Sequence, residues 1–453
     1  MNLVEELRKL IDSERVTANP TILAQHGKDE SYHQERLPDV VVFPTSTEEV
    51  SRIMRFAYRH RIPVTPFGLG SSLEGNAIPV QGGISIDFTQ MNKILEIRPH
   101  DFLVRVQPGV TRTQLNRELK RYGLFFPVDP GADATLGGMA STNASGTTTV
   151  RYGGMRDQVR QLEVVLADGR VIRPGSLAEK TSAGYFLPAL FVGSEGTLGL
   201  FTELTLKVHG IPEHSLAARA SFPSVRKAID AVVSILTAGI PIARVEFVDQ
   251  QSIKQVNAYS GTDYPEAPTL FLEFHGNQAG LEADAAFTRE MVEDHGCQDF
   301  HFETDSKARA KLWEARHNLA YAYIHGYPGK KLMTTDVCVP ISELAGAIEY
   351  TRQAIEESGL TGGILGHVGD GNYHVALMID VDDPAEMAKA HQLNEQIVHY
   401  ALERGGTCTG EHGVGIGKSK YLPREHGTSL EVMKAIKQTL DPLGILNPGK
   451  IFP

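Results

Sequence analysis

Three glycine-rich segments in the first half of this 453-residue chain constrain its fold more than any other feature. They span residues 66–76, 128–146 and 193–199, and each lies beside a predicted strand. Because glycine has no Cβ, such loops let backbone N–H groups approach a bound phosphate closely. One glycine loop is usually an ordinary turn, but three together are typical of a site for a large phosphate-bearing cofactor.

Two familiar nucleotide motifs are incomplete. Gly68-Leu69-Gly70 does not continue into the G-x-G-x-x-G fingerprint, because position 73 is leucine. Gly417-Lys418-Ser419 resembles the end of a P-loop, but the glycine required five positions earlier is His412. An ordinary Rossmann site and a nucleotide hydrolase are therefore disfavoured.

Helical and strand patterns alternate along the chain, and their texture changes after about Gly210. Before it, short strands such as 84–88 and 103–106 are interleaved with helices that begin at the capping residues Ser46 and Thr111. After it, long helical patterns alternate with strands, as expected for a separate α+β domain. We predict four segments: 1–35 (helical), 36–212 (cofactor domain), 213–405 (cap domain) and 406–453 (active-site loop and C-terminal return).

Composition limits the partners and the location. A formal charge of -11 disfavours nucleic acid, and no apolar run approaches the roughly 18 residues of a membrane span. The three cysteines, Cys297, Cys338 and Cys408, suit a reducing compartment, and we expect all three to be buried. Asn2 and Glu5 indicate a folded helix rather than a signal peptide. We expect a cytoplasmic protein, at most peripheral to the inner membrane, and mitochondrial only if a presequence has been removed.

Two histidines and a glutamate form the most distinctive chemical pattern. His367 and His374 flank Gly369 and Gly371, which let the backbone turn so that both rings can face one point. With Glu411 they make a His-His-carboxylate set with an open position, typical of a catalytic divalent metal such as zinc or manganese. Either histidine alone would more often occupy an ordinary turn. His412, next to a predicted ligand, is placed for proton transfer.

Arg316 lies on a helical pattern beside Trp313, the only tryptophan in the chain. Its guanidinium could offer a planar fork to a carboxylate. From composition alone, a solvated arginine on a helix face is the commoner case.

Together these motifs resemble the FAD-linked dehydrogenases of the vanillyl-alcohol oxidase superfamily. The resemblance is closest to the branch of cytochrome-type D-lactate dehydrogenases and glycolate oxidase flavin subunits. It rests on 66–76, on 130–146 with 193–199, and on the set His367, His374, Glu411 and His412. Thr334 stands where D-2-hydroxyglutarate enzymes commonly have a lysine, which favours a short 2-hydroxy acid.

The resemblance implies an α+β fold: a PCMH-type FAD-binding domain and a ferredoxin-like α+β cap, the FAD-linked oxidase C-terminal domain. The Gly70-Ser71-Ser72 turn has no histidine for covalent attachment, so noncovalent FAD is expected. The residues expected to bind FAD are Pro66, Gly68, Gly70, Ser71, Ser72, Gly75, Asn76, Pro130, Gly131, Thr135, Gly137, Gly138, Ser141, Asn143, Ser145, Gly146, Glu195, Gly196, Leu198, Gly199 and Asn447.

The resemblance also implies an activity, the oxidation of a D-2-hydroxy acid by hydride transfer to flavin N5. D-lactate is the preferred substrate, with glycolate and D-2-hydroxyglutarate as alternatives. A metal on His367, His374 and Glu411 would polarise the hydroxyl, His412 would act as base, and Arg316 would hold the carboxylate.

The sequence contains no NAD fingerprint, haem-attachment motif or iron–sulfur cysteine run. An external electron acceptor is therefore expected: a cytochrome, a quinone or an electron-transfer flavoprotein. A homodimer stays open, as do two other classes: a metal-dependent hydrolase using the same three ligands, and a noncatalytic flavin or metal carrier.

Overall fold

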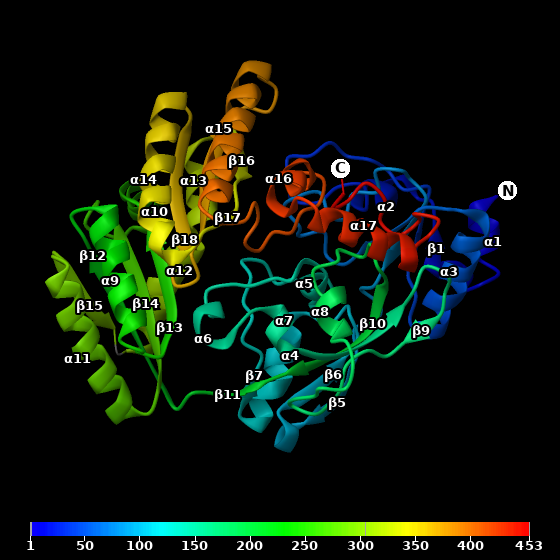
Figure 1. The fold of residues 1–453 in the computed structure, drawn as a ribbon, viewed down its shortest axis with the longest axis horizontal. Helices are drawn as coiled ribbons and strands as arrows, with labels where there is room; N and C mark the ends of the chain where they lie inside the picture. Colours follow the sequence, from blue (N-terminus) through cyan, green and yellow to red (C-terminus); the bar gives the residue numbers. More distant parts are fainter. Residues whose placement is uncertain (1, 304, 453) are drawn as a thin grey trace. The chain divides into compact units, whose positions relative to one another are not determined.

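The computed structural model describes residues 2–303 and 305–452, and the chain divides into two compact units (Figure 1). The first unit comprises Met1–Ser145, Gly153–Ile211 and Glu411–Pro453, and the second comprises Gly146–Tyr152 and Pro212–Gly410. Both units mix helices and strands, so the predicted α+β class is confirmed. The four predicted segment boundaries stay predictions.

Two main sheets form the first unit. One has the strand order β1-β2-β4-β3, in which β4 pairs in parallel with both β2 and β3. The other is antiparallel, with the order β5-β6-β10-β8-β9, and β11 pairs separately with β7. The strands are β1 (Val16–Thr17), β2 (Val40–Val42), β3 (Val64–Phe67), β4 (Ile84–Asp87), β5 (Ile94–Arg98), β6 (Leu103–Val106), β7 (Leu124–Phe125), β8 (Val159–Val165), β9 (Val171–Ile172), β10 (Leu200–Lys207) and β11 (His209–Gly210).

Helices of the first unit begin where the sequence predicted caps. Ser46 accepts a hydrogen bond from the Glu49 N–H, and Thr111 accepts one from the Gln114 N–H. The helices are α1 (Leu3–Leu7), α2 (Pro20–Gln25), α3 (Thr47–His60), α4 (Arg112–Leu119), α5 (Leu136–Thr142), α7 (Met155–Gln158), α8 (Leu187–Phe191), α16 (Leu422–His426) and α17 (Ser429–Leu440), with 3-10 turns η1 (Ser13–Arg15), η2 (Pro99–Asp101), η3 (Lys120–Tyr122) and η4 (Ser419–Tyr421).

The C-terminal segment extends the first sheet. The Val64 N–H donates to Ile445 O at 2.8 Å, and the Asn447 N–H donates to Val64 O at 2.7 Å. Leu446, fully buried, shares a core with α3 and the strands of this sheet. Residues 445–447 therefore pack beside β3, the strand that leads into the first glycine segment.

An antiparallel sheet forms the centre of the second unit, in the order β15-β12-β14-β13-β18-β19-β16, and β17 also pairs with β19. Its register places Glu246 opposite His367 and Leu365 opposite His374. The strands are β12 (His214–Ser221), β13 (Ile242–Val248), β14 (Thr269–Gly276), β15 (Asp299–Glu303), β16 (Lys331–Thr334), β17 (Val337–Cys338), β18 (Thr361–His367) and β19 (Asn372–Ile379).

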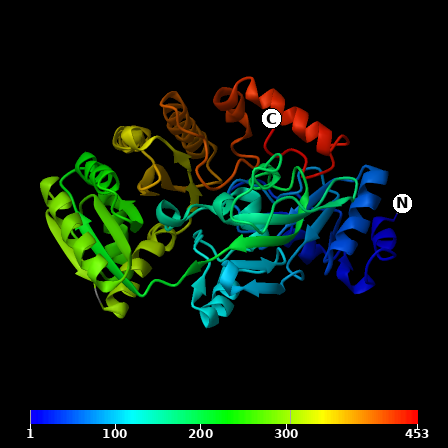
Figure 2. The same cartoon turned by 60° about the horizontal axis from the view of Figure 1, so that its bottom comes forward.

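Helices of the second unit form two packed groups. In the first group α9 packs against α11 and α14, and α14 packs against α15 (Figures 1 and 2). In the second group α10, α12 and α13 share a core with Val248, Phe271 and Met378 of the sheet. The helices are α6 (Thr149–Tyr152), α9 (Val225–Thr237), α10 (Gln250–Ser260), α11 (Gln278–Asp294), α12 (Ser306–His317), α13 (Leu319–Gly326), α14 (Ile341–Ser358) and α15 (Pro384–Glu403).

The N-terminal helix predicted from Asn2 and Glu5 is present and ends at Leu7. The prediction for the cysteines needs correction. Cys408 is buried, but Cys297 and Cys338 are partly exposed, so the expectation of three buried cysteines is wrong for these two. Both thiols lie against backbone carbonyls near strand ends, where solvent has access. Among the described residues, no helix combines the length and apolarity needed to cross a membrane.

Candidate active site

The three glycine segments come together in the first unit. A Cβ on Gly68 would lie 2.6 Å from Thr135 Oγ1, so the first and second segments touch only because residue 68 is glycine. A Cβ on Gly196 would collide with the ring of Pro66, and Gly196 also has a φ of +70°. Close backbone approach therefore requires glycine at both positions.

Glu195 and Asn447 hold these segments to the C-terminal part of the first unit. The buried carboxylate of Glu195 accepts hydrogen bonds from Asn76 Nδ2 (2.7 Å), Val414 N (2.6 Å) and Gly415 N (2.9 Å). Burial raises the pKa of Glu195, and these donors oppose that shift. The Asn447 amide donates to Asn76 O at 3.0 Å and to Glu195 O at 2.7 Å. These contacts join the predicted C-terminal return to the glycine segments, with Glu195 and Asn447 as bracing residues.

Other predicted cofactor residues shape the second glycine segment. Thr135 caps α5 by accepting from the Gly138 N–H, and Ser141 Oγ donates to Gly137 O at 2.8 Å. Ser145 Oγ donates to Glu411 Oε2 at 3.0 Å. Of the residues predicted to bind FAD, Gly146 alone falls in the second unit.

The first unit fits a large polar cofactor. Asn76 Oδ1 and Ser194 Oγ are buried and have no hydrogen-bond partner among the described residues. Buried polar atoms are costly unless they are paired. Together with the close backbone approach at Gly68 and Gly196, these two atoms offer contacts to a polar group such as the pyrophosphate or ribityl chain of FAD.

The β18–β19 hairpin of the second unit places two histidines on neighbouring strands. His367 ends β18, the chain turns through Gly371 with a φ of +81°, and His374 lies in β19. The ring centroids are 5.5 Å apart and both side chains are almost fully buried. The predicted turn between the histidines is confirmed by this geometry.

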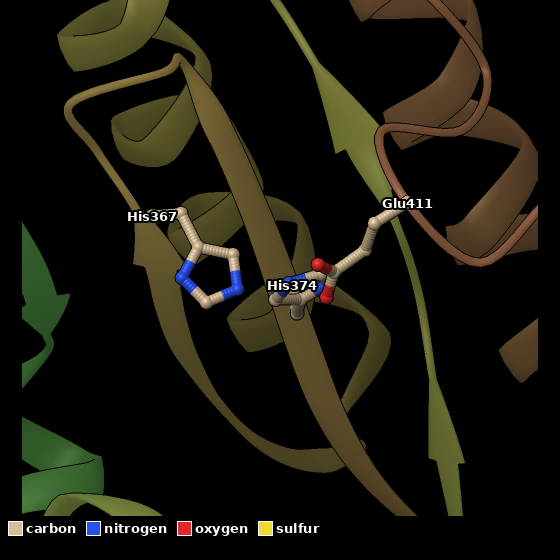
Figure 3. A group of neighbouring side chains, drawn as sticks. All are labelled: His367, His374 and Glu411. Atoms are coloured by element: carbon tan, nitrogen blue, oxygen red, sulfur yellow. The ribbon is translucent and has the colours of Figure 1, made fainter. Parts of the chain in front are cut away.

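Glu411 completes the predicted group. Atoms of His367, His374 and Glu411 that could bind a metal all lie within 4.8 Å of one another (Figure 3). Glu411 is bonded to Gly410, whose N–H donates to Asp336 Oδ2 at 2.8 Å. The donor set, two imidazoles and one carboxylate, fits a divalent cation such as zinc or manganese.

Hydrogen bonds fix the orientation of both imidazoles. His367 Nδ1 lies 2.6 Å from Glu246 Oε1, and His374 Nδ1 lies 3.2 Å from the carbonyl oxygen of Thr335. Both partners accept, so each Nδ1 donates a proton to its partner, and in the neutral imidazole the lone pair then lies on Nε2. This second layer of contacts is typical of metal-binding histidines.

Arg316 is buried, not solvated as the commoner reading of the sequence suggested. It lies on α12, is 8% exposed, and its Nη2 donates to Glu246 Oε2 at 2.6 Å. Its Nε has no hydrogen-bond partner among the described residues. Burial alone would raise the pKa of Glu246, but His367 and Arg316 outweigh burial and lower it.

Glu246 and Asp336 are residues that the sequence analysis missed. Glu246 and Arg244 are the charged residues of the otherwise apolar strand 242–248, and this was the available signal. Asp336 is fully buried and accepts from Asn372 Nδ2 and Thr409 Oγ1, both at 2.7 Å. His412 is nearly buried, and its Nε2 lies 3.7 Å from Glu411 Oε1.

Two family models cover most of the chain. Residues 38–175 match the FAD binding domain, and residues 211–451 match the C-terminal domain of FAD linked oxidases. The chain therefore belongs to the family of FAD-linked oxidases, and the predicted family and fold are confirmed.

Curated relatives narrow the branch. The chain is 47% identical to the probable mitochondrial D-lactate dehydrogenase of Danio rerio, over 99% of this chain and 91% of the relative. It is 41% identical to the mitochondrial D-lactate dehydrogenase [cytochrome] of Arabidopsis thaliana, over 100% and 80%. It is 35% identical to the glycolate oxidase subunit GlcD of Bacillus subtilis, over 94% and 92%.

Solved structures agree on the fold. Substrate-bound p-cresol methylhydroxylase has a TM-score of 0.82 at 19% identity, over 99% of this chain and 96% of that one. The 4-ethylphenol oxidase of Gulosibacter chungangensis has a TM-score of 0.81 at 20% identity, over 100% and 97%. At this level of identity the similarity concerns the fold alone.

Proposed function

We propose that this chain is an FAD-dependent D-2-hydroxyacid dehydrogenase that oxidises D-lactate to pyruvate. Relatives named D-lactate dehydrogenase, at 47% and 41% identity over nearly the whole chain, support this substrate. The observation that carries the proposal is the group of His367, His374 and Glu411, with the buried Arg316 joined to it through Glu246. Such a group suits an acid that carries a hydroxyl beside its carboxylate.

Three side chains would hold the cation. His367 and His374 would bind it through Nε2 and Glu411 through its carboxylate, leaving a position for the substrate hydroxyl. A bound zinc or manganese ion would supply the positive charge that lowers the pKa of that hydroxyl, and bound FAD would supply the hydride acceptor. In both histidines Nδ1 already faces an acceptor within the chain, so Nε2 is the nitrogen that would face the cation.

Arg316 would orient the substrate. Glu246 engages its Nη2, and the buried Nε still requires an acceptor, which a substrate carboxylate would provide. Holding the acid in one orientation can lower the activation barrier by several kcal/mol. His412 would accept the hydroxyl proton, a role typically worth about 10²–10⁴-fold.

FAD would be bound noncovalently by the glycine segments of the first unit. Gly68 and Gly196 permit close backbone approach, and Asn76 and Ser194 offer unpaired polar atoms. Electrons would leave for an external acceptor, and a relative named for cytochrome supports one of the three acceptors predicted.

Two compartments are candidates for the place of action. The relatives from Danio rerio and Arabidopsis thaliana are named as mitochondrial, whereas the glycolate oxidase subunit comes from Bacillus subtilis. The names of the first two relatives support a mitochondrial location, and the alternative is the cytoplasm with at most peripheral contact with the inner membrane.

Glycolate is the second candidate substrate, favoured by the relative named glycolate oxidase subunit. D-2-hydroxyglutarate is less favoured, because Thr334 replaces the lysine of those enzymes. A metal-dependent hydrolase would use the same three ligands but would be colourless, and the FAD-binding domain argues against it.

Anaerobic mixing of the purified protein with D- and L-2-hydroxy acids tests the proposal. D-lactate should bleach the visible flavin band, and L-lactate should not. His412→Ala should lower the rate by about 10²–10⁴-fold while FAD stays bound, because it removes the base and not the cofactor site. Unchanged bleaching in this variant would exclude His412 as the base. If glycolate bleached the flavin and D-lactate did not, glycolate would be the substrate.

A further inference from the structure

Glu246 joins two side chains that the proposed reaction uses for different purposes. It is fully buried on β13. Its Oε1 lies 2.6 Å from Nδ1 of His367 on β18, and its Oε2 lies 2.6 Å from Nη2 of Arg316 on α12. One carboxylate therefore sets the position of both a predicted metal ligand and a predicted substrate anchor.

A second buried carboxylate on the neighbouring strand provides a comparison. Glu273 on β14 accepts from His275 Nε2 at 2.7 Å and lies 3.6 Å from Arg244 Nε. Like Glu246, it has a histidine and an arginine as neighbours, but neither of these belongs to the predicted site. Both glutamates are buried charges that are paired with neighbouring side chains. Only Glu246 is paired with residues of the predicted site.

The acceptor character of Glu246 matters for both partners. A carboxylate can only accept, so His367 must carry a proton on Nδ1, and Nε2 is then the ring nitrogen that could bind a cation. The same carboxylate fixes one edge of the Arg316 guanidinium, whose buried Nε is unpaired among the described residues. Arg316 is thereby held with a donor in need of an anionic partner.

We propose that Glu246 is a positioning residue that presents His367 to the divalent cation and Arg316 to the substrate carboxylate. This inference rests on the proposed function, because it assigns those two roles to His367 and Arg316. It adds that a single side chain, touching neither cation nor substrate, sets the affinity for both.

The substitution Glu246→Gln separates the two roles. A glutamine amide has one acceptor and one donor end. The acceptor end should face Arg316, because an amide N–H₂ against the permanently charged guanidinium would leave donors unpaired. The donor end then faces His367 Nδ1 and selects the tautomer protonated on Nε2, which cannot bind a cation. Metal affinity should fall while substrate binding is retained.

The experiment uses the FAD-containing protein, freed of metal and titrated with Mn²⁺ against a chromophoric chelator. Glu246→Gln should raise the dissociation constant for Mn²⁺ by about 10–100-fold, the usual effect of removing such a partner of a metal-binding histidine. At saturating Mn²⁺ its KM for D-lactate should stay near that of the parent. Glu246→Ala should raise both constants, because it also releases Arg316.

Glu273→Gln is the matched control. It alters a buried carboxylate with the same kinds of neighbours and should leave the Mn²⁺ dissociation constant unchanged. FAD content and Tm are measured for each variant. The inference is overturned if Glu246→Gln binds Mn²⁺ like the parent protein, or if Glu273→Gln weakens binding equally, which would indicate a general effect of disturbing the sheet.

Two further outcomes are informative. If the parent protein binds Mn²⁺ but D-lactate does not bleach its flavin, D-lactate is not the substrate. The effect of Glu246→Gln on the Mn²⁺ dissociation constant still decides whether Glu246 positions His367. If Glu246→Gln does not fold, Glu246→Asp replaces it. The shorter side chain keeps the charge but cannot reach both partners, so Mn²⁺ affinity or KM should still worsen, and no change in either would contradict the inference.

Discussion

Glu195 of the first unit and Glu246 of the second are buried carboxylates that serve different purposes. In the first unit, Glu195 accepts from the backbone N–H groups of Val414 and Gly415 and from Asn76, and so braces loops. In the second unit, Glu246 accepts from the side chains of His367 and Arg316 and so orients chemical groups. The first arrangement shapes a surface for a cofactor, and the second sets the direction of individual ligands.

This difference predicts how each unit responds to change. A cofactor site formed by backbone groups depends on the absence of side chains at a few glycines, such as Gly68 and Gly196. A site made of side chains depends on the identity and protonation of each one. Loss of FAD and loss of the metal should therefore be separable.

Metal removal should give the largest effect. Dialysis against a chelator should lower flavin reduction by D-lactate by about 100-fold or more, since a bound cation contributes several kcal/mol to such a step. The absorbance of bound FAD should not change, because the glycine segments contain none of the three predicted ligands. Restoring Mn²⁺ or Zn²⁺ should restore the rate, and persistent activity after complete metal removal would contradict the proposed mechanism.

Gly196→Ala should affect FAD and spare the metal. The new methyl group would collide with Pro66, and alanine is strained at a φ of +70°. We expect the variant to lose FAD on gel filtration, because the free energy of FAD binding should be less favourable by about 1–3 kcal/mol.

Gly239→Ala is the control for backbone strain in this experiment. Gly239 has a φ of +72°, but a Cβ there meets nothing within 4 Å. This variant should keep FAD, and both variants should keep the Mn²⁺ affinity of the parent. Equal FAD loss in the two variants would show that strain, not the contact with Pro66, is responsible.

The smallest effect concerns acid stability of the first unit. Hydrogen bonds from Arg15 lower the pKa of Glu49 to about 2, below its ordinary value of 4.5. The ionised pair therefore stabilises the fold above about pH 4.5, and this contribution disappears as the pH falls towards 2. Allowing for the partial exposure of the pair, we expect it to contribute about 1–2 kcal/mol to the free energy of unfolding.

Thermal unfolding of Glu49→Gln from pH 7 to pH 3 tests this contribution. The variant should have a lower Tm than the parent at pH 7, and the difference should shrink as the pH falls. Glu179→Gln is the control, since Glu179 also forms ion pairs, with Arg160 and Lys207, but its side chain is 68% exposed. A Tm difference for Glu49→Gln that is the same at every pH would refute the assignment.

Local sequence was enough for features that depend on neighbouring residues. The caps at Ser46 and Thr111 follow from side-chain contacts three residues along the chain. The turn that brings His367 towards His374 follows from the glycines between them. The glycine segments likewise indicated close backbone approach, because no other residue type removes the Cβ.

Tertiary structure alone decided which distant groups meet. Glu246 lies 70 residues from Arg316 and 121 from His367, and Glu195 lies 119 residues from Asn76 and 219 from Val414. No local pattern specifies such pairs, because strand register and loop packing determine which charge faces which donor. The sequence thus determined the chemical groups and the flexible positions of this protein. The fold decided their partners, since buried polar groups must be paired and only packing brings those partners within hydrogen-bond distance.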